Sequence, residues 1–184
     1  MNILVSACLL GVNCRYNGKG ELCGKLQELM KKHHLIPVCP EQLGGLPTPR
    51  IPAERVQDRV LTQRGEDVTA QYEKGAGETA GLAGLFGCRC AILKERSPSC
   101  GSGRIYDGTF SRKLTDGDGV AAALLKKQGL RVFGESEIEQ IKEYLEGTGE
   151  RWKRLRRNAV KAEDEKKEAS PGYRRLQGQP WCFW

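Results

Sequence analysis

Three cysteines of this chain each follow, within seven residues, a short apolar run that has the character of a buried strand: Cys8, Cys39 and Cys100. Helical patterns separate these runs, and strands that alternate with helices predict an α/β fold with a mostly parallel sheet, flanked by helices. The carboxyl ends of parallel strands lie along one edge of a sheet. We therefore expect the three thiols to meet at that edge, where Cys14, from the first of these loops, can join them.

Apolar periodicity, glycine and proline predict the regular elements. Strands are expected at 2–6, 35–38, 90–93 and 131–133, and helices at about 26–30, 70–86, 120–127 and 135–145. Hairpins are expected to pair 60–62 with 68–69 and 104–106 with 109–110. The helix at 70–86 carries four glycines, so close packing against the sheet is expected to compensate for its weak helicity. Four prolines and a Gly-Gly pair predict a shaped loop without regular structure at 39–52.

Length and cysteine content indicate the class of protein. The chain has 184 residues, enough to bury a core without disulfides, and eight cysteines. Its first apolar run is short and strand-like, which favours a strand over a secretory signal. We therefore expect a cytoplasmic protein, because cysteines in reducing surroundings bind metals or react rather than pair. No apolar stretch approaches the roughly 20 residues that span a bilayer, so no membrane partner is expected.

Positive charge is concentrated at the C-terminus. The formal net charge is +7, and residues 151–184 hold ten Lys/Arg against four Asp/Glu. We expect an α/β domain at 1–149 and a basic, partly disordered extension at 150–184. Basic residues beside Trp152 suit a polyanion such as tRNA. A solvated charged tail accounts for the same pattern.

Thiolates without a well-placed histidine suit zinc or an iron–sulfur cluster. His33 and His34 more simply end a helix, where cations suit the helix dipole. The alternative interpretation is that the cysteines are buried, inert thiols. It fits best the four cysteines that do not lie in loops shaped by glycine and proline, which are Cys23, Cys88, Cys90 and Cys182. Two other functions are compatible with the cysteines: a zinc-structured nucleic-acid-binding module and a thiol-based sulfur carrier.

Six separated motifs carry a resemblance. They are VSACLLG at 5–11, CRYNG at 14–18, PVCPE at 37–41, GGLPTPR at 44–50, LK with SPSCG at 93–101, and IYDG at 105–108. In this order they resemble the thiouracil desulfidase family, over about residues 2–135. The resemblance implies a [4Fe-4S] cluster held by three cysteines, with one iron free to bind the sulfur of a thiolated pyrimidine. It also implies hydrolytic, non-redox release of that sulfur as hydrosulfide.

The resemblance carries site residues over by motif. The candidate cluster ligands are Cys8, Cys14, Cys39 and Cys100, one more than required, and the strand-end argument favours the set without Cys14. The implied catalytic residues are Glu41 and Ser97. Glu41 is placed to take a proton from the attacking water, and the serine to orient or relay it. A surface or capping carboxylate is the alternative for Glu41, and a turn role, with hydroxyls bonding backbone amides, is equally compatible with Ser97.

Substrate contacts are expected from Ser99, Arg15, Arg50 and Thr48. The arginines, Arg104 among them, offer a donor fork to a phosphate or a pyrimidine oxygen, and an exposed ion pair is their alternative role. Tyr106 is a further candidate for the pocket. A free base, a nucleoside, a nucleotide and a thiolated tRNA are all compatible substrates.

Overall fold

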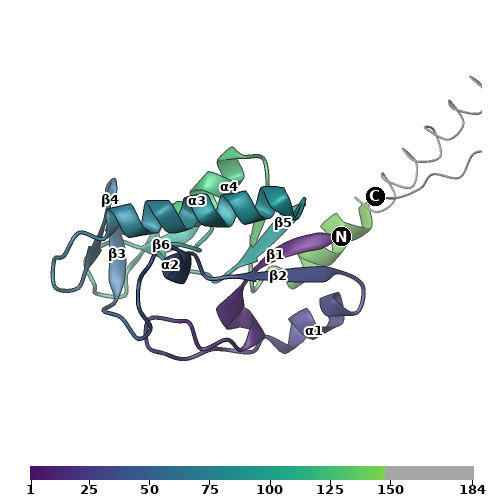
Figure 1. Ribbon diagram of the computed structural model, residues 1–184, viewed down its shortest axis with the longest axis horizontal. Coiled ribbons are helices and arrows are strands. Elements are labelled where there is room, and N and C mark those ends of the chain that lie inside the picture. Colours follow the sequence, from purple (N-terminus) through teal and green to yellow (C-terminus); the bar gives the residue numbers. More distant parts are fainter. Residues whose placement is uncertain (148–184) are drawn as a thin grey trace, which may run out of the picture. The chain divides into compact units, whose positions relative to one another are not determined.

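A four-stranded parallel sheet forms the centre of the computed structural model, which describes residues 1–147 (Figure 1). The strands are β1 (Asn2–Ser6), β2 (His34–Val38), β5 (Cys90–Leu93) and β8 (Arg131–Gly134), in the spatial order β2-β1-β5-β8. From β1 the chain moves outward to β2, and from β5 it moves outward to β8 on the other side. A topological switch point, where α/β proteins bind ligands, therefore lies between β1 and β5. The predicted fold class is confirmed.

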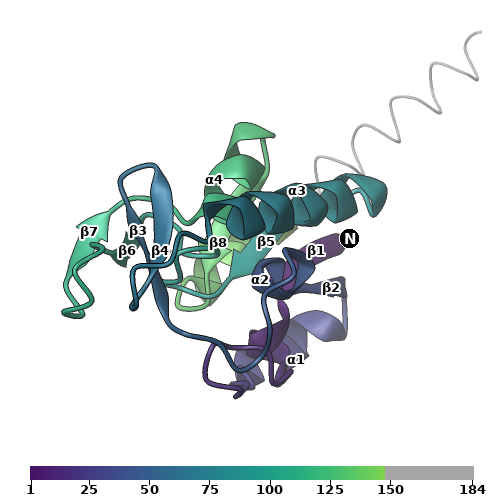
Figure 2. The ribbon, with the colours of Figure 1, turned by 60° about the vertical axis from the view of Figure 1, so that its left-hand side comes forward.

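Helices cover both faces of the sheet. They are α1 (Gly24–Met30), α3 (Thr69–Leu85) and α4 (Val120–Lys127). Helices α3 and α4 pack side by side on one face, and α1 lies on the other (Figures 1 and 2). Consecutive residues of the central strands β1 and β5, whose side chains point to opposite faces of the sheet, are all fully buried: Ile3, Leu4, Val5, Ala91, Ile92 and Leu93. Burial on both faces explains why these strands read as continuous apolar runs in the sequence.

Two antiparallel hairpins accompany the sheet, and their main pairings differ from the prediction. The predicted contact of 60–62 with 68–69 is present in part, because Leu61 forms an isolated antiparallel bridge with Asp67 and the Val68 N–H donates to the carbonyl oxygen of Val60 at 2.9 Å. Strand β4 (Arg59–Thr62) pairs with β3 (Ala53–Val56), and β6 (Arg104–Tyr106) pairs with β7 (Leu114–Asp116). The sequence of β3 is short, charged and preceded by proline, so its strand signal is weak. Residues 109–110 do not pair with β6, because the N–H groups of Thr109 and Phe110 are taken by carboxylates.

A one-turn helix, α2 (Pro40–Leu43), lies where no regular structure was expected. That prediction was wrong because proline is tolerated in the first turn of a helix, where its missing N–H would have no intrahelical partner. Helices α2 and α3 meet at two glycines. A Cβ on Gly44 would lie 1.9 Å from the carbonyl oxygen of Gln71, and one on Gly75 would lie 1.8 Å from that of Pro40. The other three glycines of α3, at 77, 81 and 84, have nothing within 4 Å of the position that a Cβ would take. Of the four glycines expected to pack closely against the sheet, only Gly75 makes a close contact, and its partner is α2.

The chain divides into two compact units, Met1–Ile138 and Glu139–Trp184. Residues 138–147 are helical, so the last predicted helix begins later than expected. The predicted boundary at 149 and the basic extension at 150–184 lie outside the described residues. Within residues 1–147, no helix combines the length and apolarity needed to cross a membrane, and none of the seven cysteines forms a disulfide.

Candidate metal centre

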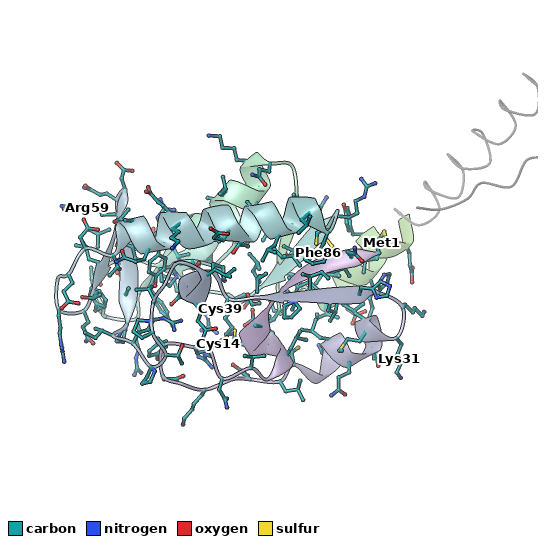
Figure 3. All side chains as sticks on the ribbon, viewed as in Figure 1. Met1, Cys14, Lys31, Cys39, Arg59 and Phe86 are labelled. Carbon is teal, nitrogen blue, oxygen red and sulfur yellow. The ribbon has the colours of Figure 1, made fainter. Side chains whose placement is uncertain are left out.

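Four cysteines line one cavity of about 330 Å³ at the carboxyl ends of β1, β2 and β5: Cys8, Cys14, Cys39 and Cys100. Each is placed by a different piece of backbone. Cys8 lies in a 3₁₀ helix (Ala7–Leu10) after β1, Cys39 connects β2 to α2, and Cys100 follows β5. The Cys39 thiol donates to the carbonyl oxygen of Cys14 at 3.7 Å, which fixes these two loops beside each other (Figure 3). The chain therefore gathers, at the switch point, thiols that are up to 92 residues apart in sequence.

The environment of three of these thiols, those of Cys14, Cys39 and Cys100, raises their pKa values and favours the protonated form. Burial raises the pKa of Cys100 to about 12, although the hydroxyls of Ser6 and Ser99 lower it. The contact with Cys14, together with burial, raises the pKa of Cys39 far above its ordinary value. Cys39 lowers the pKa of Cys14, but the contact with Cys8 and burial outweigh this, so that pKa is also raised. Thiols of this kind become ligands when a bound metal displaces their protons.

The donor set of the cavity suits an iron–sulfur cluster. Four thiols line the cavity, and Cys14 contacts both Cys8 and Cys39. Cysteine thiolates are the usual ligands of iron–sulfur clusters, and no histidine lines this cavity. The residues present therefore fit such a cluster.

Glu41 borders the cavity from α2, between a buried cation and a serine. Arg50 Nε donates to Glu41 Oε2 at 2.6 Å, and Ser97 Oγ donates to Oε1 at 3.5 Å. Only 6% of the Arg50 side chain is exposed, and it also donates to the carbonyl oxygens of Cys14 and Pro47, both at 3.1 Å. Burial acts to lower the pKa of Arg50, but Glu41 raises it, so the guanidinium stays charged. Arg50 therefore holds the carboxylate and the Cys14 loop in one geometry.

The Ser-Pro-Ser-Cys-Gly loop is held by hydrogen bonds of the Ser97 side chain and by packing of its backbone against α4. Ser97 Oγ accepts hydrogen bonds from the N–H groups of Ser99 and Cys100, each at 3.1 Å, so it has a turn role as well as its contact with Glu41. The loop also packs onto the start of α4, where a Cβ on Gly119 would lie 2.4 Å from the carbonyl carbon of Ser99. These contacts fix Cys100 relative to Glu41.

The predicted substrate-binding residues do not all reach the cavity. Arg15 lines it and forms an ion pair with Glu21 at 3.1 Å, and Arg50 lines it as described. Thr48 lies behind Arg50, and its hydroxyl accepts hydrogen bonds from Arg50 and Gln42. Ser99 is fully buried and does not line the cavity; its hydroxyl has no partner in ordinary hydrogen-bond geometry among the described residues, but it lies near the Cys100 thiol.

Of the other residues considered in the sequence analysis, some line the cavity and some do not. Tyr106 lines the cavity, whereas Arg104 is exposed and lies 3.9 Å from Asp116. Three cysteines interpreted as inert thiols lie away from the cavity: Cys23, Cys88 and Cys90.

Sequence reasoning missed several side chains of the cavity wall, among them Glu54, Tyr72 and Lys94. Tyr72 is 2% exposed on α3, and burial, together with Glu41, raises its pKa well above the ordinary value. The close approach of α2 and α3 at Gly75 brings it there. Lys94 forms an ion pair with Glu135, and its backbone N–H donates to Ser6 Oγ at 2.9 Å, which ties β5 to β1. Only Lys94 stood in a recognised motif; nothing local distinguished the other two.

Comparisons with known proteins agree with this geometry. Residues 3–137 match the 2-thiouracil desulfurase family. The uncharacterized protein YbbK of Bacillus subtilis (strain 168) is 47% identical over 149 residues, which cover 76% of this chain and 99% of that protein. A solved structure, described as the [4Fe-4S]-dependent thiouracil desulfidase TudS, aligns with a TM-score of 0.75 at 45% identity, covering 79% of this chain and 97% of that one. The cysteine loops and the cavity all lie within the matched segment, and the chain belongs to the 2-thiouracil desulfurase family.

Proposed function

We propose that this protein hydrolyses the thiocarbonyl of thiolated pyrimidines, giving the oxo-pyrimidine and hydrosulfide without net redox change. The observation that carries the proposal is that four cysteines, a carboxylate and a serine from distant parts of the chain share one cavity. Membership of the 2-thiouracil desulfurase family and likeness to a [4Fe-4S]-dependent desulfidase support it.

A [4Fe-4S] cluster in this cavity would be held by three of Cys8, Cys14, Cys39 and Cys100. When bound with one iron open, such a cluster supplies a Lewis acid that withdraws electron density from the thiocarbonyl carbon through its soft sulfur. The strand-end argument favours Cys8, Cys39 and Cys100 as the three ligands. Cys14, which contacts Cys8 and Cys39, then borders the cluster.

Glu41 and Ser97 are proposed to position water and to accept its proton. Ser97 Oγ lies 3.5 Å from Glu41 Oε1, so both oxygens border the same point of the cavity, where a water molecule can contact either of them. Ser97 Oγ is held by two backbone N–H groups, and Glu41 Oε2 is held by Arg50. As water attacks the thiocarbonyl carbon, one of its protons passes to Glu41 and the new C–O bond forms. The C–S bond then breaks, and sulfur leaves as hydrosulfide with the second proton of the water.

The two alternative functions, a thiol-based sulfur carrier and a zinc-structured nucleic-acid-binding module, receive less support. A sulfur carrier needs an accessible, low-pKa thiolate as its nucleophile, whereas the pKa values of Cys14, Cys39 and Cys100 are all raised. The matching family and the similar solved structure are described as a 2-thiouracil desulfurase and a [4Fe-4S]-dependent desulfidase, which does not favour a zinc-structured module. The basic residues expected to contact tRNA lie in 150–184, outside the described residues, so tRNA binding stays a prediction, as does a cytoplasmic location.

The test compares cysteines inside and outside the cavity. Wild type, Cys100→Ser and Cys23→Ser are loaded with iron and sulfide without oxygen, and iron content, absorbance near 400 nm and hydrosulfide release from 2- and 4-thiouracil are measured. Wild type and Cys23→Ser should carry about four irons and release hydrosulfide, whereas Cys100→Ser should lose both properties. Sulfide release by Cys100→Ser at the wild-type rate, or iron-loaded wild type that releases none from either base, would contradict the proposal.

A further inference from the structure

Glu54 is a buried carboxylate on the cavity wall that has no part in the proposed reaction. It lies in β3, is 8% exposed and borders the same cavity as the cysteines. Its Oε2 accepts hydrogen bonds from the backbone N–H groups of Gly108 and Phe110, each at 3.0 Å. Hydrogen bonds to a charged acceptor are about twice as strong as those between neutral groups. Glu54 therefore ties the loop between β6 and β7 to β3.

Direct backbone packing supports the same attachment. A Cβ on Gly108 would lie 2.7 Å from the carbonyl oxygen of Arg55, and the φ of +88° at this position favours glycine. Arg55 in turn donates to the carbonyl oxygen of Asp118, just after β7, at 2.6 Å. The hairpin β6–β7 is thus attached to β3 at its loop and at its base.

The attached loop supplies a part of the cavity wall that the sheet edge does not. Tyr106, at the end of β6, and Arg112, in the loop, both line the cavity. Phe110 and Arg112 have φ values of 58° and 64°, in the left-handed region that non-glycine residues rarely adopt. Such a conformation persists where surrounding contacts determine it. The two hydrogen bonds to Glu54, one of them from Phe110 itself, are contacts of this kind.

We propose that Glu54 is a positioning residue that seats residues 107–112 as the outer wall of the cavity, so that Tyr106 and Arg112 contact the substrate ring and determine its affinity. This inference rests on the proposed function. A planar pyrimidine bound by its sulfur at the strand ends needs a surface to fix the rest of the ring. Tyr106 offers an aromatic face, and Arg112 a planar cation with several N–H donors. The strand-end cysteines lie on other segments, so loosening this wall should spare the metal centre.

Two substitutions at Glu54 distinguish the effect of its hydrogen bonds to the loop from the effect of its negative charge. Glu54→Gln retains a carbonyl oxygen that can accept both N–H groups, whereas Glu54→Ala removes the acceptor and leaves both without it. Exposed Glu73→Ala on α3 is the matched control. For iron-loaded protein, Glu54→Ala should raise KM for 2-thiouracil about 10- to 100-fold while kcat changes less than about threefold. Glu54→Gln and the control should stay within about threefold of wild type in both constants.

Limited digestion with trypsin measures the same attachment without activity. Cleavage after Arg112 and Lys113, identified by the masses of the fragments, should be at least about tenfold faster in Glu54→Ala than in wild type, with equal iron content. Wild-type KM together with wild-type cleavage in Glu54→Ala would overturn the inference, and so would a fall in kcat alone. If wild type had no desulfidase activity, the proposed function would fail, and the cleavage rates would still report on the loop.

A second variant covers the case in which Glu54→Ala does not fold. Gly108→Ala leaves the carboxylate intact but places a Cβ 2.7 Å from the carbonyl oxygen of Arg55. It should show the same rise in KM and the same faster cleavage. A Gly108→Ala protein that retains the wild-type KM and cleavage rate would refute the seating of this loop.

Discussion

Replacing Gly75 by alanine should separate α2 from α3 and disturb the site, although alanine is the better helix former. A Cβ at Gly75 would lie 1.8 Å from the carbonyl oxygen of Pro40, and contacts under 3.0 Å essentially never occur for real Cβ atoms. The obstacle is backbone, so no side-chain rotation relieves it, and the two helices must move apart by more than 1 Å. Because α2 carries Glu41, this movement displaces the carboxylate from Ser97 and Arg50.

The magnitudes follow from two opposing effects. Overpacking costs about 1–3 kcal/mol, and the gain in helix propensity returns about 1 kcal/mol, so Gly75→Ala should lower stability by up to about 2 kcal/mol. Gly77 lies two residues further along the same helix with nothing within 4 Å of its Cβ position. Gly77→Ala should therefore gain about 1 kcal/mol. A displacement of about 1 Å at a catalytic group can cost about 100-fold in rate, and we expect a loss of that order in kcat/KM for Gly75→Ala only.

Thermal unfolding and steady-state kinetics on the two iron-loaded variants measure these effects. The Tm of Gly77→Ala should exceed that of Gly75→Ala by about 2–12 °C for a chain of this size. Equal Tm values, or a Gly75→Ala enzyme with wild-type kcat/KM, would show that the helix contact does not control the position of Glu41.

Two further substitutions test the residues around the carboxylate. Glu41→Gln should keep its iron but lose about 10²- to 10⁴-fold in kcat, because the amide cannot accept the proton; unchanged turnover of 2-thiouracil would exclude Glu41 as the base. Arg50→Lys should lower the free energy of unfolding by about 2–4 kcal/mol, measured in urea, because an ammonium cannot reach the four acceptors that the guanidinium contacts. The exposed Arg59→Lys is its control, and equal urea midpoints for the two variants would count against a structural role for Arg50.

Much of the sheet could be predicted because its two central strands, β1 and β5, are buried on both faces. Residues 3–5 and 90–93 are apolar throughout, and such runs between turns indicate central parallel strands whatever their neighbours. The strand-end rule then places Cys8, Cys39 and Cys100 along one edge, and all three line the cavity there.

The prediction failed where pairing depends on distant partners. Strand β3 has two charged residues among its four, and one of them, Glu54, is buried because the N–H groups of Gly108 and Phe110, more than 50 residues away, satisfy its carboxylate. The loop before β7 is shaped by the same carboxylate. No local pattern encodes such a contact, so the pairings of β4 with β3 and of β6 with β7 could not be predicted from sequence, whereas the local contact of β4 with residues 67–68 could.

The sequence alone determined the α/β class, the buried parallel strands and the cysteine-bearing loops at their ends, because apolar runs and turn residues act locally. Tertiary structure alone decided that Arg50 supports Glu41 and the Cys14 loop, that Tyr72 borders the cavity, and that Glu54 holds its outer wall. These roles depend on which backbone groups and charges come within a few ångströms after folding. A residue's type and its neighbours in sequence do not carry that information.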